Sequence, residues 1–164
     1  MVTPPVSAKS LNAANDALNE DDLIIRKAIS LLEQRMFKRG PAFQNPEDVE
    51  QYLRLQLGGE KREVFACVFL DSKHRLIAIE SLFFGTIDVT SVHPRVILQR
   101  ALELNSAALI MAHNHPSGDT NPSVVDGALT RHLQEILAKV DIRLLDHFII
   151  GEGKPYSFAS AGLL

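Results

Sequence analysis

Two histidines, a serine and an aspartate lie close together in the stretch AHNHPSGDTNPSVVD, residues 112 to 126. His113 and His115 are two residues apart, and side chains at that spacing point to the same face of a β-strand. Ser123 and Asp126 are three residues apart, which places two side chains on one face of a helix. Two histidines and one carboxylate are the ligand set of a catalytic zinc, whose fourth position is open to water. We therefore predict that His113, His115 and Asp126 bind zinc, one ion per chain.

A catalytic zinc site also needs a general base near the water and a hydrogen-bond donor for the oxyanion. Ser123 is the predicted donor, because it lies beside Asp126 on the exposed first turn of the expected helix. The base should be a carboxylate from another part of the sheet. Glu63, at the start of the first central strand, is the preferred candidate, and Glu80 in the second strand is the alternative.

The sequence before the metal stretch predicts two helices. Residues 1–20 are expected to form a disordered lead-in, since they combine prolines, serines and asparagine with little apolar periodicity. An amphipathic helix is predicted from Asp21, with Leu23, Ile24, Ala28, Leu31 and Leu32 on its apolar stripe and Gly40-Pro41 as its stop. NPEDVEQYLRLQL predicts a second helix, with Asn45 as N-cap, that ends at Gly58-Gly59.

The remaining segments alternate between strand and helix patterns. Strands are predicted for EVFACVFLD, RLIAIESLFFG, AALIMAHNH, IRLLDHFIIG and YSF, and the first two should form a hairpin. Helices are predicted for HPRVILQRALELN and for NPSVVDGALTRHLQEILAKV. In the latter, Asn121-Pro122 is the expected cap and first turn, and the apolar residues along one face are Val125, Leu129, Leu133, Ile136, Leu137 and Val140. This order predicts one α/β domain over 21–164, with helices at 21–58, a metal-site core at 59–164, a mixed sheet and helices on both of its faces.

Composition excludes several classes of protein. With 46% hydrophobic and 23% charged residues and a net charge of −3, the chain has no basic field that would indicate nucleic acid or an anionic membrane as its main partner. The single cysteine, Cys67, excludes a disulfide framework and a multi-cysteine zinc site, and its apolar neighbours predict a buried hydrophobic side chain. No apolar run is long enough to span a membrane, and the first residues lack a signal-peptide pattern. We expect a cytoplasmic protein.

The spacing of Glu63, His113-x-His115 and Ser123-x-x-Asp126 resembles the JAMM motif, also called MPN+, of zinc isopeptidases and related hydrolases. More closely, AHNHPSGDTNPS with LLDHFIIG and YSFASAGLL resembles the RadC family of bacterial proteins, over roughly residues 20–164. This resemblance implies a three-layer α/β/α sandwich of the cytidine-deaminase-like kind. It also implies the short form of the family, which lacks an N-terminal helix-hairpin-helix region.

The resemblance further implies a role for each motif residue. His113, His115 and Asp126 would bind zinc, Glu63 would hold the water, and Ser123 would steady the tetrahedral intermediate. One departure is Val96, where relatives often have glutamate after the arginine of HPRVIL; this position is not part of the motif.

Two functions follow as hypotheses. The first is a zinc metallohydrolase of peptide or isopeptide bonds, whose partner is a peptide or protein substrate. The alternative is a non-catalytic or DNA-associated module, as the family's link to DNA repair implies, with a structural metal site; the net charge does not support nucleic acid. A zinc deaminase is excluded, because its ligand pattern requires more than one cysteine. RLIAIESLFF is a candidate edge strand for pairing with a peptide substrate or with a second copy in a homodimer.

The other polar residues receive structural interpretations. His147, in the Asp146-His147 pair at the end of a strand, is expected to be a core residue or to support the metal loop, and not to bind the metal. Asp119 is a predicted turn residue, with a contact to the metal loop as the alternative, and His93 should cap the following helix or pack beside it. His74 and His132 are predicted surface residues.

Overall fold

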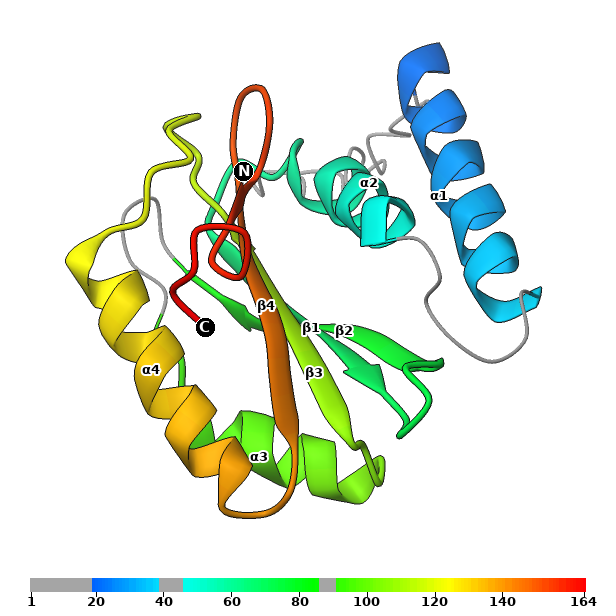
Figure 1. Cartoon of the computed structure of the whole chain (residues 1–164). Helices are drawn as coiled ribbons and strands as arrows, with labels where there is room; N and C mark the ends of the chain where they lie inside the picture. Colours follow the sequence, from blue (N-terminus) through cyan, green and yellow to red (C-terminus); the bar gives the residue numbers. More distant parts are fainter. Residues whose placement is uncertain (1–18, 39–45, 86–90) are drawn as a thin grey trace, which may run out of the picture.

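The computed structural model describes residues 19–38, 46–85 and 91–164, which form a five-stranded mixed sheet with four helices (Figure 1). The elements in chain order are α1 (Glu20–Lys38), α2 (Pro46–Leu57), β1 (Val64–Leu70), β2 (Leu76–Phe84), α3 (Pro94–Glu103), β3 (Ala108–Asn114), α4 (Val124–Ala138), β4 (Arg143–Ile150) and β5 (Tyr156–Ser157). Each predicted element is present. Of the lead-in predicted for residues 1–20, residues 1–18 lie outside the described residues, as do the Gly40-Pro41 stop and the Asn45 cap, whereas Glu20 already belongs to α1.

The sheet has the order β2-β1-β3-β4-β5. β1 and β2 form the predicted antiparallel hairpin, β1 also pairs antiparallel with β3, and β3 pairs parallel with β4. All seven residues of β1 and all seven of β3 are buried, as their continuous apolar runs predict. Within this sheet β2 is an edge strand, which is the position expected for RLIAIESLFF.

The sheet separates two apolar clusters, one on each of its faces. On one face, alternate residues of β1, β3 and β4 pack against α2 and against Leu32 of α1. On the other face, the intervening residues pack against α3 and α4, which Figure 1 shows together on that side. Burial of apolar area is the main favourable term in folding. Because alternate residues of β1 and β3 belong to the two opposite clusters, apolar packing on both faces stabilises these strands. This confirms helices on both faces.

α1 lies against α2 and is the most exposed helix of the fold (Figure 1). Leu32 is buried and Ile29 is partly buried, but Leu23 and Ile24 of the predicted apolar stripe are 53% and 62% exposed. The apolar stripe is therefore buried over only part of its length, because α1 has a neighbour over only part of its surface. None of the described helices combines the length and the apolar character needed to cross a membrane.

The start of α4 differs from the prediction. Its N-cap is Ser123, two residues later than Asn121, because the Ser123 side chain satisfies the free backbone N–H of Asp126. Val125, which periodicity places on the apolar face of the helix, is 74% exposed. Successive residues of a helix are turned by about 100°, so the rotation that points Asp126 at the sheet turns Val125 away from it. Val140 is also exposed, because it follows the end of the helix.

Candidate metal centre

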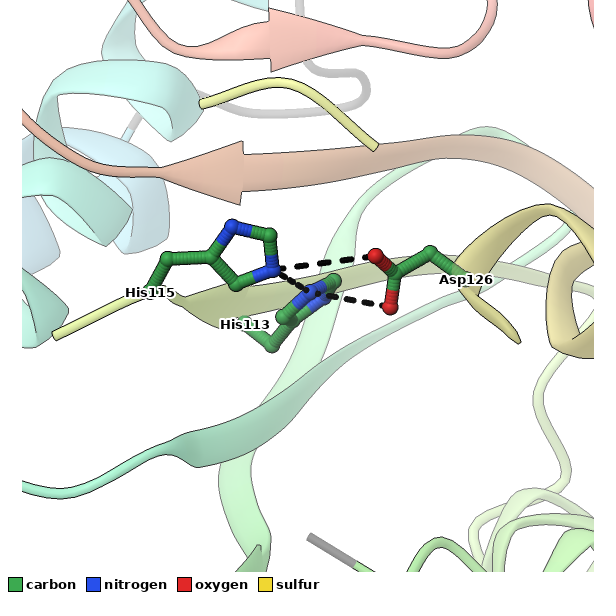
Figure 2. Close-up of side chains that lie close together, drawn as sticks. All are labelled: His113, His115 and Asp126. Carbon is green, nitrogen blue, oxygen red and sulfur yellow. Dashed lines mark hydrogen bonds and ion pairs between the residues drawn. The ribbon is translucent and has the colours of Figure 1, made fainter. Parts of the chain in front are cut away.

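His113, His115 and Asp126 meet where β3 ends and α4 begins. His113 lies in β3, His115 directly follows the strand, and Asp126 is in the first turn of α4. Figure 2 shows the Asp126 carboxylate facing both imidazole rings. His113 Nε2 lies 3.0 Å from His115 Nε2 and 3.3 Å from Asp126 Oδ1, and one ligand atom from each residue lies within 4.8 Å of the others. The structure thus brings the three predicted ligands together in a group that could hold a metal ion.

Asp126 is held in place by the start of its own helix. Ser123 and Asp126 form a capping box, in which Asp126 Oδ2 accepts hydrogen bonds from the Ser123 backbone N–H (2.7 Å) and hydroxyl (2.6 Å). The pKa of the Asp126 carboxyl lies below its usual range although burial acts to raise it, and the hydrogen bonds that the carboxylate accepts from Ser123 contribute to this lowering. The carboxylate is therefore ionised and its Oδ1 faces His113, as metal binding requires.

The loop after β3 holds His115. The backbone N–H of His115 donates to the Ile150 carbonyl of β4 (2.9 Å), and its Nδ1 lies 2.7 Å from the Asp119 carbonyl oxygen. The Asp119 carboxylate accepts from the backbone and side chain of Asn121, so Asp119 is the predicted turn residue and also contacts the metal loop. Gly118 has a φ of 84°, a left-handed conformation that favours glycine in this turn.

His147 lies directly behind His113. It is fully buried in β4, with Nε2 2.9 Å from His113 Nδ1 and Nδ1 2.7 Å from Thr130 Oγ1. The Phe158 ring stacks on it at a centroid distance of 5.0 Å. Burial lowers the pKa of His147 well below its usual value, so the ring is neutral. His147 therefore packs in the core and supports a ligand, as interpreted from its position in the sequence.

The donor atoms of the centre fit a divalent transition metal. The Nδ1 atoms of both histidines are engaged away from the centre, by His147 and by the Asp119 carbonyl. Their Nε2 atoms and Asp126 Oδ1 are therefore the atoms that converge on the centre. A set of two imidazole nitrogens and one carboxylate oxygen suits zinc.

The two carboxylates predicted as candidate bases occupy different places. Glu63 is partly buried directly before β1, and its carbonyl accepts from the Gly85 N–H (2.8 Å). Phe65 pairs with His113 in the antiparallel pair of β1 and β3, so Glu63, directly before β1, lies at the same end of the sheet as His115, directly after β3. Glu80 pairs with Cys67, further along the strand, and its carboxylate binds Arg100 of α3 at 2.6 and 2.8 Å.

Asn114, between the two histidines, has a role that the sequence interpretation missed. Its Oδ1 accepts from the Val64 N–H (2.8 Å), and its Nδ2 donates to the carbonyls of Glu60 (3.2 Å) and Arg62 (3.0 Å). The side chain thus fixes the backbone on both sides of Glu63. The sequence did contain a signal for this role, namely an asparagine at the end of an apolar strand. A buried side-chain amide requires several hydrogen-bond partners.

The remaining polar residues have structural positions. Asp146 accepts from the His147 N–H, the Ala159 N–H and the Ser157 hydroxyl, and so ties β4 to the C-terminal segment. His93 is the N-cap residue of α3 without a side-chain cap bond, and its ring packs against Phe83. His74 is in a turn beside Arg143, and His132 is exposed on α4. Cys67 is buried, which raises the pKa of its thiol and confirms it as a core residue.

Comparison with known proteins places this geometry in a family. Residues 43–163 match the family described as "RadC-like JAB domain". The fold and the site together define the class of protein: an α/β domain of the JAB type with a His-His-Asp candidate metal site. The chain belongs to the RadC-like JAB domain family.

Close relatives carry the name "UPF0758 protein". The chain is 55% identical over 127 residues to one from Azotobacter vinelandii and 54% identical over 143 residues to one from Leptothrix cholodnii. These alignments cover 77% and 87% of this chain but 57% and 62% of the relatives, so the chain spans less than two thirds of their length. A relative from Polaromonas is 44% identical over 162 residues, which cover 99% of this chain and 72% of the relative.

Proposed function

We propose that the protein is a zinc-dependent hydrolase of the JAMM type that cleaves a peptide or isopeptide bond. The observation that carries the proposal is the convergence of His113, His115 and Asp126, whose donor atoms face one another at the end of β3. Membership of the RadC-like JAB domain family supports it. The deaminase-like arrangement of layers, the cytoplasmic location and the homodimer remain predictions.

The proposed reaction hydrolyses an amide to an acid and an amine. Zinc bound by these three ligands supplies a Lewis acid that lowers the pKa of water to about 7. Glu63 accepts the proton of the attacking water and passes it to the departing amine nitrogen. Ser123 donates its hydroxyl hydrogen to the oxyanion, which requires this hydrogen to turn away from Asp126 Oδ2.

Two features of the structure favour these assignments. The Glu80 carboxylate is bound by the half-buried Arg100 of α3, away from the candidate ligands. Asn114, between the two histidines, holds the backbone on both sides of Glu63. Val124 and Val125, the two residues before Asp126, are among the most exposed apolar side chains described, and they offer a substrate peptide an apolar surface at the rim.

The test compares wild type, Glu63→Gln and His113→Ala by elemental analysis and by hydrolysis of peptide and isopeptide substrates. Wild type and Glu63→Gln should each contain about one zinc per chain, and His113→Ala should contain none. Glu63→Gln should lose activity by about 10²–10⁴-fold with zinc retained, because only proton transfer is removed. Glu60→Gln, the same change at an exposed position of the same segment, is the matched control.

Two outcomes would contradict the proposal. Hydrolysis that survives in a metal-free His113→Ala/Asp126→Ala double variant would exclude a metal-dependent reaction. A Glu63→Gln variant with unchanged function would instead favour the alternative, a non-catalytic or DNA-associated module with a structural metal.

A further inference from the structure

A chain of buried hydrogen bonds joins two of the candidate ligands behind the metal centre. It runs from the backbone carbonyl of Asp126 to Thr130 Oγ1 (2.6 Å), from there to His147 Nδ1 (2.7 Å), and from His147 Nε2 to His113 Nδ1 (2.9 Å). Thr130, His147 and His113 are each no more than 1% exposed. The chain crosses α4, β4 and β3, so it is formed only in the folded molecule.

The direction of every hydrogen bond in this chain follows from its first member. A carbonyl oxygen only accepts, so the Thr130 hydroxyl donates its single hydrogen to Asp126 O. Thr130 Oγ1 must then accept from His147 Nδ1–H. The fully buried His147 ring has a hydroxyl and an imidazole as partners of its two nitrogens, and a buried charge without a counter-ion is costly, so the ring carries one hydrogen only. With that hydrogen on Nδ1, Nε2 carries the electron pair and accepts from His113 Nδ1–H.

The consequence falls on the other nitrogen of His113. With the hydrogen on Nδ1, His113 Nε2 carries an electron pair, and this nitrogen faces Asp126 Oδ1 at 3.3 Å. His115 reaches the same state by a different route, since its Nδ1–H donates to the Asp119 carbonyl. Both rings therefore present Nε2 to the centre, but only the His113 ring depends on side chains that substitution can change.

We propose that His147 and Thr130 are positioning residues that set the tautomer and ring orientation of His113 for metal binding. This inference deepens the proposed function and rests on the candidate centre being a metal site. Outer partners of metal-binding histidines generally fix the ring and strengthen the ligand, and their loss costs about 10–100-fold in metal affinity. Here the outer partner of His113 is His147, and the hydrogen position on His147 is set through Thr130 by the backbone carbonyl of a second candidate ligand, Asp126.

The first experiment measures zinc affinity by competition with a chelator. Thr130→Val removes the hydroxyl with nearly the same shape, leaves His147 Nδ1–H unpaired and allows the ring to reverse its hydrogen bonds. The zinc dissociation constant should rise about 10–100-fold. Thr130→Ser retains the hydroxyl and should stay within about threefold of wild type, as a rescue that a packing effect alone would not give.

A second pair of variants addresses His147 directly. His147→Gln places an amide oxygen near the position of Nε2 and can still accept from His113, whereas His147→Leu cannot. Zinc should bind more tightly to His147→Gln than to His147→Leu. Circular dichroism and thermal melting show which variants fold. If a His147 variant does not fold, the comparison of Thr130→Val with Thr130→Ser decides whether the inference holds.

The second experiment reads the tautomer without any activity assay. Long-range proton–nitrogen correlation spectra of the imidazole rings should show His147 with its hydrogen on Nδ1 in the wild-type protein, with or without zinc. A hydrogen on His147 Nε2, or equal zinc affinity in wild type and Thr130→Val, would overturn the inference and leave the proposed function standing. Wild-type protein that binds no zinc would overturn both.

Discussion

At the scale of single residues, the centre is built from side chains that other hydrogen bonds already hold. Ser123 is at once the cap of α4 and the proposed oxyanion donor, and Asp126 is both the capping-box acid and a candidate ligand. His115 is held by the Asp119 carbonyl and His113 by His147. The side chains are therefore oriented before any metal binds, which reduces the entropic cost of binding.

Asn114 carries a prediction at this scale. Asn114→Ala removes the partners of the Val64 N–H and of two carbonyls in the Glu63 segment, so it should destabilise the fold by roughly 2 kcal/mol in urea unfolding. Zinc content should be retained, because none of the three candidate ligands is changed.

Asn114→Asp is a second test of this prediction. It keeps an acceptor for the Val64 N–H but places a buried negative charge against the Glu60 and Arg62 carbonyls, so at neutral pH it should be no more stable than Asn114→Ala. An Asn114→Ala variant as stable as wild type would show that the amide does not hold this segment.

At the scale of elements, two loops must pack closely to place His115. The Glu152 N–H donates to the Gly118 carbonyl (2.8 Å), and a Cβ added at Gly151 would lie 2.4 Å from that same oxygen. Glycine at 151 therefore allows the end of β4 to touch the loop that follows β3. The parallel pairing of β3 with β4 brings these two loops to the same edge of the sheet.

Gly151→Ala tests this packing. The methyl group collides with backbone, so the loop that carries Asp119 must shift, and we expect a loss of about 1–3 kcal/mol in stability together with weaker zinc binding. Urea unfolding and zinc titration measure the two effects. Gly59→Ala is the matched control, because a Cβ there meets nothing within 4 Å; equal behaviour of the two variants would argue against the close approach.

At the scale of the whole molecule, the candidate ligands join β3 to α4, which are also held together by the apolar cluster between sheet and helices and by the hydrogen bonds through His147. A ligand that binds only the folded state stabilises it by about 2.7 kcal/mol at a free concentration 100 times its dissociation constant. Zinc should therefore stabilise the fold itself.

We expect saturating zinc to raise the melting temperature of the protein by about 5–10 °C at that concentration, and a chelator to reverse the rise. Differential scanning calorimetry measures it. His115→Ala should show no such rise, because it removes one ligand of the group. A similar rise in both proteins would place zinc elsewhere on the molecule.

Much of the architecture was predictable because it depends on local periodicity. The continuous apolar runs of β1 and β3 predicted buried central strands, and all nine elements predicted along the chain are present. The candidate ligands were predictable for the same reason, since His113-x-His115 on a strand and Ser123-x-x-Asp126 on a helix are short-range spacings.

Tertiary structure decided what depends on distant partners. The exposure of Leu23, Ile24 and Val125 follows from which faces of α1 and α4 have neighbours, and periodicity within one helix does not contain that information. Three contacts join residues that are at least 17 positions apart in the chain. They are the ion pair of Glu80 with Arg100, the hydrogen bond from the Val64 N–H to Asn114, and the hydrogen bond between Thr130 and His147. Sequence alone thus determined the types and local spacing of the ligands, and the packing of β3, β4 and α4 decided how they are oriented, because hydrogen-bond direction is set by atoms that meet only in the fold.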